Sequence, residues 1–225
     1  MRKVMVGTPS YDGRIEVFYA DALRRTEKLF TEHGIALAPI YMAYDALVQR
    51  ARNDLVKIAI EHEFDDLLFI DSDIIWDPAW ALKFIEYPVD CVGGAYRKKT
   101  DEQELYAVRA QLPIPVDLKT GLLIVDGIGT GFLRLSRRAL LALWERSQRY
   151  VNEGRECRMV FDLAIINGQL QSEDIVMCDK LKDAGINVYV DPSFTCTHIG
   201  IKQYRGDFAA YIAKRTAKCS VAATA

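Results

Sequence analysis

The chain has few cysteines, and none of them forms a CxxC pair. Five cysteines stand among 225 residues, an odd number at irregular spacing. This pattern argues against a disulfide framework and against a zinc site, and it favours a reducing compartment. The opening MRKVMVG is too short an apolar segment for a signal peptide, because the polar TPSYDGR follows at once. We therefore expect a cytoplasmic protein.

Long apolar runs and a strong excess of one charge are also missing. No run approaches the roughly 18–20 apolar residues of a membrane-spanning helix, so we expect no membrane anchor. The formal net charge of −2 does not indicate a dedicated nucleic-acid-binding protein, although local basic patches could still exist. With 50% hydrophobic and 27% charged residues, the composition is that of an ordinary globular protein. The length suits one large domain, or one domain with a small extension.

Apolar runs alternate with helix-like segments in the first half of the chain. We expect strands at 3–7, 35–42, 65–70 and 89–96, and helices at 16–33 and 46–62. In the second half we expect a long polar loop with an edge strand over 97–120 and a hairpin or strand pair around a glycine-rich turn over 121–136. Helices are expected at 137–147 and 172–185, with an irregular stretch at 150–171 between them. A strand at 186–190 follows, and a helix that begins at 207 ends in a disordered tail. This order predicts a single α/β domain with a mixed, mostly parallel central sheet and a smaller antiparallel part.

Two aspartates, Asp71 and Asp73, close the buried strand that ends at Ile70. Because side chains alternate faces along a strand, the two carboxylates would project the same way, about 7 Å apart. Open α/β sheets bind ligands at the carboxyl ends of their strands, and two carboxylates there repel unless a cation lies between them. A hard divalent ion is the simplest candidate. The alternative is a plain strand end at which Asp73 or Asp77 caps a helix over 76–86.

Two later motifs fit a site built around such an ion. In SEDIVMCDKLKDAG, Ser172 would cap a helix and place Glu173 and Asp174 in its first turn. The helix dipole favours acids there, and one carboxylate could face a cleft. His198 follows a strand-like segment, and imidazole suits a divalent metal that carboxylates already hold.

Lys202 and Arg205 come just after His198 and could hold a diphosphate beside the metal. Each of these features also has a plain explanation: acids at a helix start, a satisfied histidine and a solvated charged loop. The site is indicated by their order, which runs from the strand and DxD through a glycine-rich loop and the acidic helix start to the histidine.

This order resembles that of the GT-A glycosyltransferases, which are nucleotide-sugar-dependent, metal-dependent transferases with a Rossmann-like domain. A particular resemblance to fungal mannan-polymerase mannosyltransferases and to phage- and virus-encoded relatives is carried by RARNDLVKIAIEHEFDDLLFIDSDI, GIGTGFLRLSRRAL and SEDIVMCDKLKDAGINVYVDPSFTCTHIG. It covers residues 3–206, with little contributed by 97–120 and 145–170. The resemblance implies a GT-A domain over 1–206, followed by a C-terminal helix and flexible tail over 207–225.

The resemblance also implies roles for individual residues. Asp73 would ligate Mn²⁺ or Mg²⁺ directly, Asp71 would touch the ribose or a metal-bound water, and His198 would be the second protein ligand. The loop after the first strand would contact the base and ribose, and Arg52, with Asn53 beside it, would face the nucleotide. The donor-binding residues so implied are Thr8, Pro9, Tyr11, Asp12, Arg52, Asp71, Ser72, Gly129, Gly131, Lys202 and Arg205; the metal-binding residues are Asp71, Asp73 and His198.

The chemistry would need a carboxylate base for the acceptor hydroxyl. Asp174 is our first choice for this base and Glu173 the second. If Asp174 is the base, displacement is direct and inverts the anomeric centre, whereas the likeness to the fungal enzymes points to retention. Gly129 and Gly131 would let the backbone approach the sugar or acceptor closely, unless they simply form a hairpin turn.

The acceptor hydroxyl would lie on a soluble glycan, a protein or modified DNA. The consecutive Arg97, Lys98 and Lys99 follow a strand and should lie at the same sheet edge as the DxD. Five further cations would complete a basic rim around the cleft: Arg134, Arg137, Arg138, Lys202 and Arg205. Such a rim would steer a polyanion, and the specific candidate is 5-hydroxymethylcytosine in phage DNA.

Two other classes of protein compete with this interpretation. HAD-type phosphatases also carry DxD after a buried strand, but normally near the N-terminal strand and with Thr or Val where Ile75 stands here. A non-catalytic nucleotide-sugar- or carbohydrate-binding module is the second alternative. The presence of both acidic motifs together with His198 argues against such a module.

Overall fold

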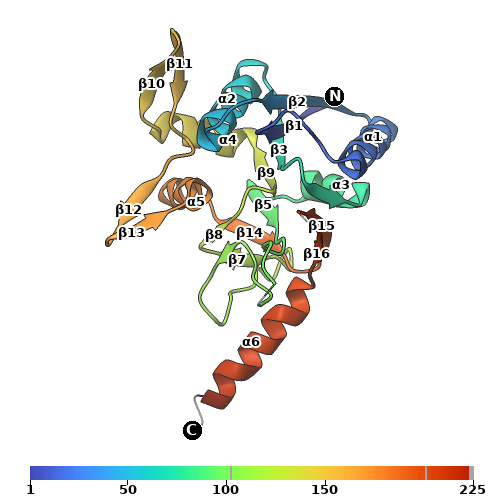
Figure 1. The fold of residues 1–225 in the computed structure, drawn as a ribbon, viewed down its shortest axis with the longest axis vertical. Coiled ribbons are helices and arrows are strands. Elements are labelled where there is room, and N and C mark those ends of the chain that lie inside the picture. Colours follow the sequence, from blue (N-terminus) through green and yellow to red (C-terminus); the bar gives the residue numbers. More distant parts are fainter. Residues whose placement is uncertain (102, 201, 223–225) are drawn as a thin grey trace.

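The central sheet has seven strands in the order β2-β1-β3-β9-β5-β14-β7 (Figure 1). The computed structural model describes residues 1–101, 103–200 and 202–222. Strands β2, β1, β3, β5 and β14 run in one direction, and β9 and β7 run in the other. The expected mixed, mostly parallel sheet is therefore confirmed. Its strands are β1 (Arg2–Ser10), β2 (Ile35–Ala43), β3 (Asp66–Ile70), β5 (Cys91–Gly94), β7 (Leu123–Val125), β9 (Phe132–Ser136) and β14 (Val188–Asp191).

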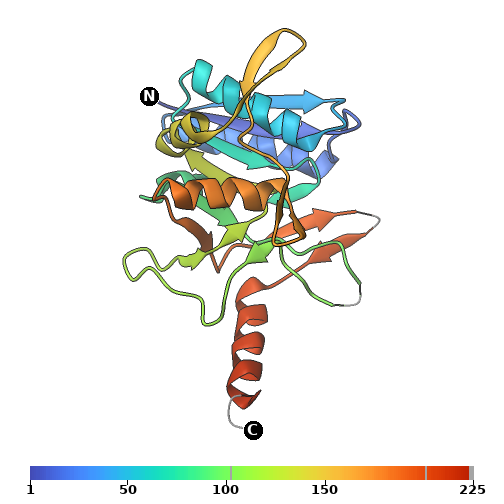
Figure 2. The same ribbon diagram turned by 90° about the vertical axis from the view of Figure 1, so that its left-hand side faces the viewer.

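Helices cover both faces of this sheet (Figures 1 and 2). Side chains of α1 and α3 join one core cluster, and those of α2, α4 and α5 join the other. The side chains of strand β1 alternate between the two faces, as the two-residue period of a strand requires. Val4 and Val6 belong to the first cluster, that of α1 and α3, and Met5 belongs to the second cluster, that of α2, α4 and α5. The helices are α1 (Val17–Glu32), α2 (Val48–Glu61), α3 (Pro78–Glu86), α4 (Arg137–Arg146), α5 (Glu173–Asp183) and α6 (Phe208–Ala222).

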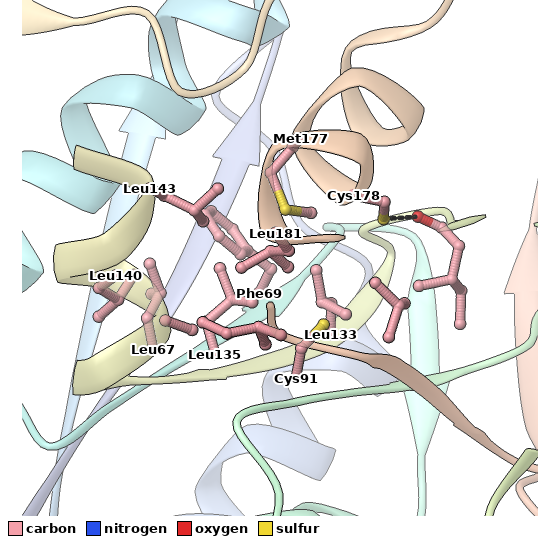
Figure 3. Close-up of a cluster of buried hydrophobic side chains, with 14 of the residues drawn as sticks. Leu67, Phe69, Cys91, Leu133, Leu135, Leu140, Leu143, Met177, Cys178 and Leu181 are labelled. Carbon is pink, nitrogen blue, oxygen red and sulfur yellow. Dashed lines mark hydrogen bonds between the residues drawn. The ribbon is translucent and has the colours of Figure 1, made fainter. Parts of the chain in front are cut away.

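The second cluster packs α4 and α5 onto the sheet (Figure 3). Phe69 of β3, Leu143 of α4 and Met177 of α5 are all fully buried in it. The thiol of Cys178 donates to the carbonyl of Ile128 at 3.7 Å, and burial raises its pKa to about 12. This cysteine is therefore a packed core residue that stays protonated, in keeping with the absence of a cysteine motif.

Residues 121–136 do not form the expected hairpin. Strand β7 lies at one edge of the sheet beside β14, whereas β9 lies between β3 and β5. Phe132–Ser136 is buried over its first four residues, so this strand needs neighbours on both sides that a two-stranded hairpin would not supply. The edge strand expected within 97–120 is β6 (Val108–Arg109), which pairs with β8 (Gly127–Ile128).

The expectation that residues 150–171 are irregular was wrong. They form two hairpins, β10 (Arg149–Asn152) with β11 (Arg155–Arg158) and β12 (Ala164–Ile166) with β13 (Gln169–Gln171). Each hairpin turns at a pair with positive φ, Glu153–Gly154 at 49° and 77° and Asn167–Gly168 at 53° and 75°. Such pairs make the two-residue turns of tight hairpins, so the Asn-Gly dipeptide was a usable signal.

The C-terminal segment is helical, as expected. Helix α6 projects from the body of the molecule (Figures 1 and 2). Its start is anchored by Phe208, whose ring centroid lies 4.9 Å from that of Tyr106. The end of the expected flexible tail, residues 223–225, lies outside the described residues, and the division at residue 206 stays a prediction. Within the described ranges, no helix is both long and apolar enough to cross a membrane.

Candidate functional site

The DxD aspartates lie in a turn between β3 and β4 (Ile74–Trp76). The turn is closed by the Ile74 amide, which donates to the carbonyl of Asp71 at 3.0 Å. The strand alternation expected for Asp71 and Asp73 therefore does not apply to them. Asp77 caps α3, accepting from the Ala79 amide at 2.9 Å, so Asp73 is not used as a cap.

Asp73 and His198 are brought together by a small antiparallel sheet in the order β16-β15-β4. Strands β15 (Cys196–Ile199) and β16 (Gln203–Arg205) form it with β4, and His198 is paired with Ile74. The Nε2 atom of His198 lies 3.5 Å from Oδ1 of Asp73, while Nδ1 lies 2.8 Å from the carbonyl of Arg97. Because a carbonyl oxygen can only accept, Nδ1 carries a hydrogen and donates it to Arg97, which leaves Nε2 as the ring atom that faces the carboxylate.

Lys99 is the second partner of Asp73, with Nζ 2.5 Å from Oδ2. Burial acts to raise the pKa of Asp73, but the hydrogen bonds and charges of His198 and Lys99 outweigh it and leave the pKa below its ordinary value. The carboxylate is thus held ionised, as a metal ligand must be.

A hard divalent cation fits this pair. A carboxylate oxygen and an imidazole nitrogen 3.5 Å apart can both reach one ion with bonds of about 2.1 Å. Among the described residues, no group of three or more His, Cys, Asp or Glu side chains could hold a metal. The remaining ligands would have to come from substrate or water. Asp71 contacts Arg52 at 3.1 Å, and its role as a ligand stays a prediction.

Arg52 of α2 forms a buried network with two acids. It is 6% exposed, donates to Asp71 at 3.1 Å and also donates to Glu173 at the start of α5. Burial acts to lower the pKa of Arg52, but Asp71 and Glu173 outweigh it and raise the pKa. Its neighbour Asn53 is fully buried and bonds to the backbone of Phe161 in both directions, at 2.7 and 3.1 Å, and its contact with a nucleotide stays a prediction.

A hollow of about 200 Å³ lies beside the DxD turn. It brings together five of the residues expected to bind the donor: Pro9, Tyr11, Arg52, Asp71 and Ser72. Met42, Asp45 and Asp73 line it as well. Thr8 and Asp12 are not among its lining residues: Thr8 is fully buried against the hydroxyl of Tyr19, and Asp12 accepts from the Arg14 amide at 3.0 Å. We name this space the DxD hollow.

A second hollow of about 590 Å³ contains both His198 and Asp174. Tyr96, Lys99 and Arg109 also line it. Oδ1 of Asp174 accepts from the Ile175 amide at 2.8 Å and from the hydroxyl of Ser172, whose side chain makes no cap bond to the helix backbone. In the part of the chain that the structure describes, Asp174 forms no ion pair. We name this space the Asp174 hollow.

Gly129 and Gly131 make room for the ring of Tyr96. A Cβ atom at Gly129 would lie 2.3 Å from the hydroxyl oxygen of Tyr96, and one at Gly131 would lie 2.7 Å from its ring. The Tyr96 ring in turn lies edge-on to that of His198, with centroids 5.2 Å apart. These glycines therefore support the histidine through Tyr96, and their direct contact with a sugar or acceptor stays a prediction.

The expected basic rim forms only in part: Lys98 and Lys99 line the Asp174 hollow, whereas its other members line neither hollow. Arg134 is 4% exposed and donates to Asp66 at 2.7 Å, at the opposite end of β3 from Asp71. Arg137 and Arg138 lie at that same opposite end, where they bond to the carbonyl of Phe64 and to the side chain of Asp90. Lys202 pairs with Asp101, Arg205 contacts Gln203 at 3.5 Å, and neither lines either hollow. Of the expected rim, Lys99 is the cation that contacts Asp73.

Two solved structures share this fold over most of the chain. Protein A197 from STIV has a TM-score of 0.53 at 18% identity, covering 89% of this chain and 86% of that one. A mutant of the Drosophila β-1,4-galactosyltransferase 7, in complex with manganese, UDP-Gal and xylobiose, has a TM-score of 0.50 at 14% identity, covering 89% of this chain and 71% of that one. At these identities the likeness concerns the fold alone, which is the GT-A fold. No family model matches the sequence, and no curated protein does either. The nearer resemblance to fungal and phage enzymes stays a prediction.

Proposed function

We propose that the chain is a metal-dependent glycosyltransferase that moves a sugar from a nucleotide-sugar donor to an acceptor hydroxyl. One observation carries the proposal: Asp73 lines the DxD hollow, His198 lines the Asp174 hollow, and these two side chains face each other at 3.5 Å. Group transfer needs two such sites in contact, because donor and acceptor atoms must meet at about 3–3.5 Å.

The DxD hollow would take the nucleotide. Tyr11 is 75% exposed at this hollow and offers an aromatic face to a base. Asp45 receives two hydrogen bonds of 2.8 Å from Arg50, which lower the pKa of its carboxyl. The carboxylate remains an acceptor for a base that presents an N–H group.

Asp73 and His198 would hold Mn²⁺ or Mg²⁺, with oxygens of the donor diphosphate completing the shell. The bound cation would stabilise the negative charge that develops on the leaving diphosphate. The chain itself contributes the ionised Asp73, the fixed tautomer of His198 and the positive charge of Lys99 at this point.

Asp174 would act as the general base. The acceptor O–H would give its proton to Asp174 while its oxygen forms a bond to the anomeric carbon. The bond from that carbon to the diphosphate oxygen breaks, and the diphosphate keeps the electron pair. Direct displacement of this kind inverts the anomeric centre. Glu173, our second choice, is paired with Arg52 and so would act as a positioning group.

The rival classes are less well supported by these contacts. The catalytic aspartate of a phosphatase would have to be free to attack, whereas Asp71 bonds to Arg52 and Asp73 to Lys99. A binding module would not need a carboxylate such as that of Asp174, which forms no ion pair with the described residues, in a hollow next to the metal pair.

Calorimetric titration with a panel of nucleotide sugars, with and without Mn²⁺, tests the donor and the metal together. Turnover measured on the same samples separates an enzyme from a binding module. Metal-dependent binding of at least one donor, followed by its consumption, is the expected result. Binding without turnover for every acceptor would identify a module, and release of inorganic phosphate from a phosphomonoester would identify a phosphatase.

The acceptor would be a soluble glycan, a protein or DNA that carries 5-hydroxymethylcytosine. DNA was suggested by the expected basic rim, and three arginines of that rim lie at the far end of the sheet. Lys98 and Lys99 alone remain beside the Asp174 hollow, so DNA has less support as the acceptor. A competition assay with a free oligosaccharide and hydroxymethylated DNA at several salt concentrations compares the candidates. Transfer to DNA that falls steeply with salt would retain this acceptor; transfer to the glycan alone would remove it.

A further inference from the structure

We propose that Lys99 is a tethered cation that guards Asp73, so that the divalent metal binds together with the donor diphosphate and only weakly without it. The inference rests on the proposed function, because it concerns the same metal pair. It assigns to Lys99 a positioning role that the sequence suggested for Lys202 and Arg205.

Asp73 is approached on both of its oxygens. Lys99 Nζ lies 2.5 Å from Oδ2, and His198 Nε2 lies 3.5 Å from Oδ1. A metal bound to Asp73 and His198 would share this one carboxylate with the ammonium group. Two cations at such a distance repel, and the carboxylate cannot neutralise both. Metal alone therefore binds Asp73 against the repulsion of Lys99, or displaces the lysine and loses its ion pair, and either cost weakens its binding.

The side chain of Lys99 can move away from Asp73 while its backbone stays in place. Its side chain is 34% exposed, and among the described residues its ammonium has no hydrogen-bond partner other than Asp73. The stem passes over Gly200, where a Cβ atom would lie 3.0 Å from Cδ of Lys99. The backbone around it is held, because the Lys98 amide donates to Leu105 at 2.7 Å. The side chain can therefore swing into the Asp174 hollow, which it already lines, while the loop stays in place.

A donor diphosphate changes this balance. Its oxygens complete the shell of the metal and at the same time offer the displaced ammonium a new anionic partner. Metal and diphosphate should then strengthen each other's binding, and by thermodynamic reciprocity the factor is the same in both directions. This coupling depends on Lys99, because without it the metal has no competitor and the diphosphate loses a cation.

The test compares Mn²⁺ binding to wild type, Lys99→Met and Lys182→Met, with free Mn²⁺ measured by EPR in the absence and presence of UDP, and of GDP in a parallel series. Lys182 is the matched control, since it carries the same charge, pairs with a partly exposed aspartate, Asp126, at 2.8 Å and lines neither hollow. We expect Lys99→Met to bind Mn²⁺ more tightly without nucleotide, by up to about fivefold, the effect of losing one partly exposed ion pair. The strengthening by nucleotide should shrink by a similar factor, and Lys182→Met should match wild type in both.

Asp73→Asn distinguishes failure of this inference from failure of the proposed site. If Asp73→Asn loses Mn²⁺ binding but Lys99→Met binds no more tightly than wild type, the metal pair stands and the guarding role of Lys99 is overturned. If Asp73→Asn binds Mn²⁺ as wild type does, the metal site and the inference fall together. Transfer without any metal in wild type, lost in Lys99→Met, would show that the lysine replaces the metal, and this also overturns the inference. Thermal unfolding of each variant checks that the fold is retained.

Discussion

The guanidinium of Arg52 donates to the carboxylate of Glu173, and this contact joins helix α2 to the first turn of helix α5. Arg52 also donates to Asp71 at 3.1 Å. One buried cation therefore aligns the DxD turn with the helix start that carries Asp174. Without it, two acids from distant parts of the sequence would face each other unpaired.

Replacing Arg52 with methionine should lower the free energy of unfolding by about 1–3 kcal/mol, because it leaves two partly buried carboxylates without their charged donor. Urea denaturation measures this loss. Arg24→Met provides the control: Arg24 pairs with Asp21 on the surface, so its loss should cost no more than about 1 kcal/mol. Equal stability of Arg52→Met and wild type would mean that the network does not hold the two helices together.

Asp73→Asn and His198→Ala should each abolish metal-dependent transfer while leaving the thermal unfolding curve close to that of wild type. The physical reason is the loss of several kcal/mol of transition-state stabilisation that a catalytic metal supplies. Initial rates at saturating Mn²⁺, and again in EDTA, measure the effect. Full activity of wild type in EDTA would rule out the metal.

Asp174→Asn should lower kcat by roughly 10²–10⁴-fold with little change in donor binding, as expected for the loss of a general base. Glu173→Gln should lower kcat less and reduce stability, because Glu173 is paired with Arg52. Rates and donor titrations on both variants separate the two roles. Reversed sensitivities would exchange the roles, and the product anomer determined by NMR decides independently between inversion and retention.

Asp191 should make stability depend on pH. It is 3% exposed and bonds to Lys83 at 2.7 Å and to the hydroxyl of Tyr87 at 2.8 Å. Burial acts to raise the pKa of Asp191, but bonds from Lys83, Ser193 and Tyr87 outweigh it and lower the pKa. Its contribution is therefore complete above the ordinary value of about 3.9 and is lost as pH falls through the lower folded value.

Asp191→Asn should accordingly cost about 1–3 kcal/mol near neutral pH. The difference from wild type should shrink as pH falls below about 4, where the wild-type carboxyl also becomes neutral. Urea unfolding at a series of pH values gives both curves, and the exposed Asp21→Asn serves as control. Parallel curves for Asp191→Asn and wild type would contradict the assignment.

Local sequence signals predicted most of the regular structure and the centre of the site. The two-residue and helical periods located the strands and helices of the first half, and Asp77 and Ser136 each cap the helix that follows them. The resemblance placed Asp73 and His198 in one metal site, and the structure brings them together through the small sheet, in which β15 pairs with the strand that follows the DxD turn.

The positions of charged residues were the part of the structure that the sequence predicted least well. Arg134 looked like a surface cation, but its partner Asp66 stands 68 residues away on the neighbouring strand, and both are buried. Lys99 and Lys202 carry the same charge in similar polar loops. Of these two lysines, only Lys99 contacts Asp73. The position of Lys99 depends on the isolated β-bridge between Arg97 and Tyr106. Such choices are made by tertiary packing and leave no local pattern.

Strand β9 joins the two halves of the central sheet, and this has a consequence during synthesis. Its partner β3 is completely buried in the finished fold, yet the residues of β9 that cover it follow about 60–70 positions later in the chain. At roughly 5–20 residues per second, the apolar edge of β3 stays unpaired for several seconds as the chain emerges. Unpaired apolar edges attract other chains. We therefore expect this protein to be most vulnerable to aggregation while it is still being translated, before residue 136 has left the ribosome.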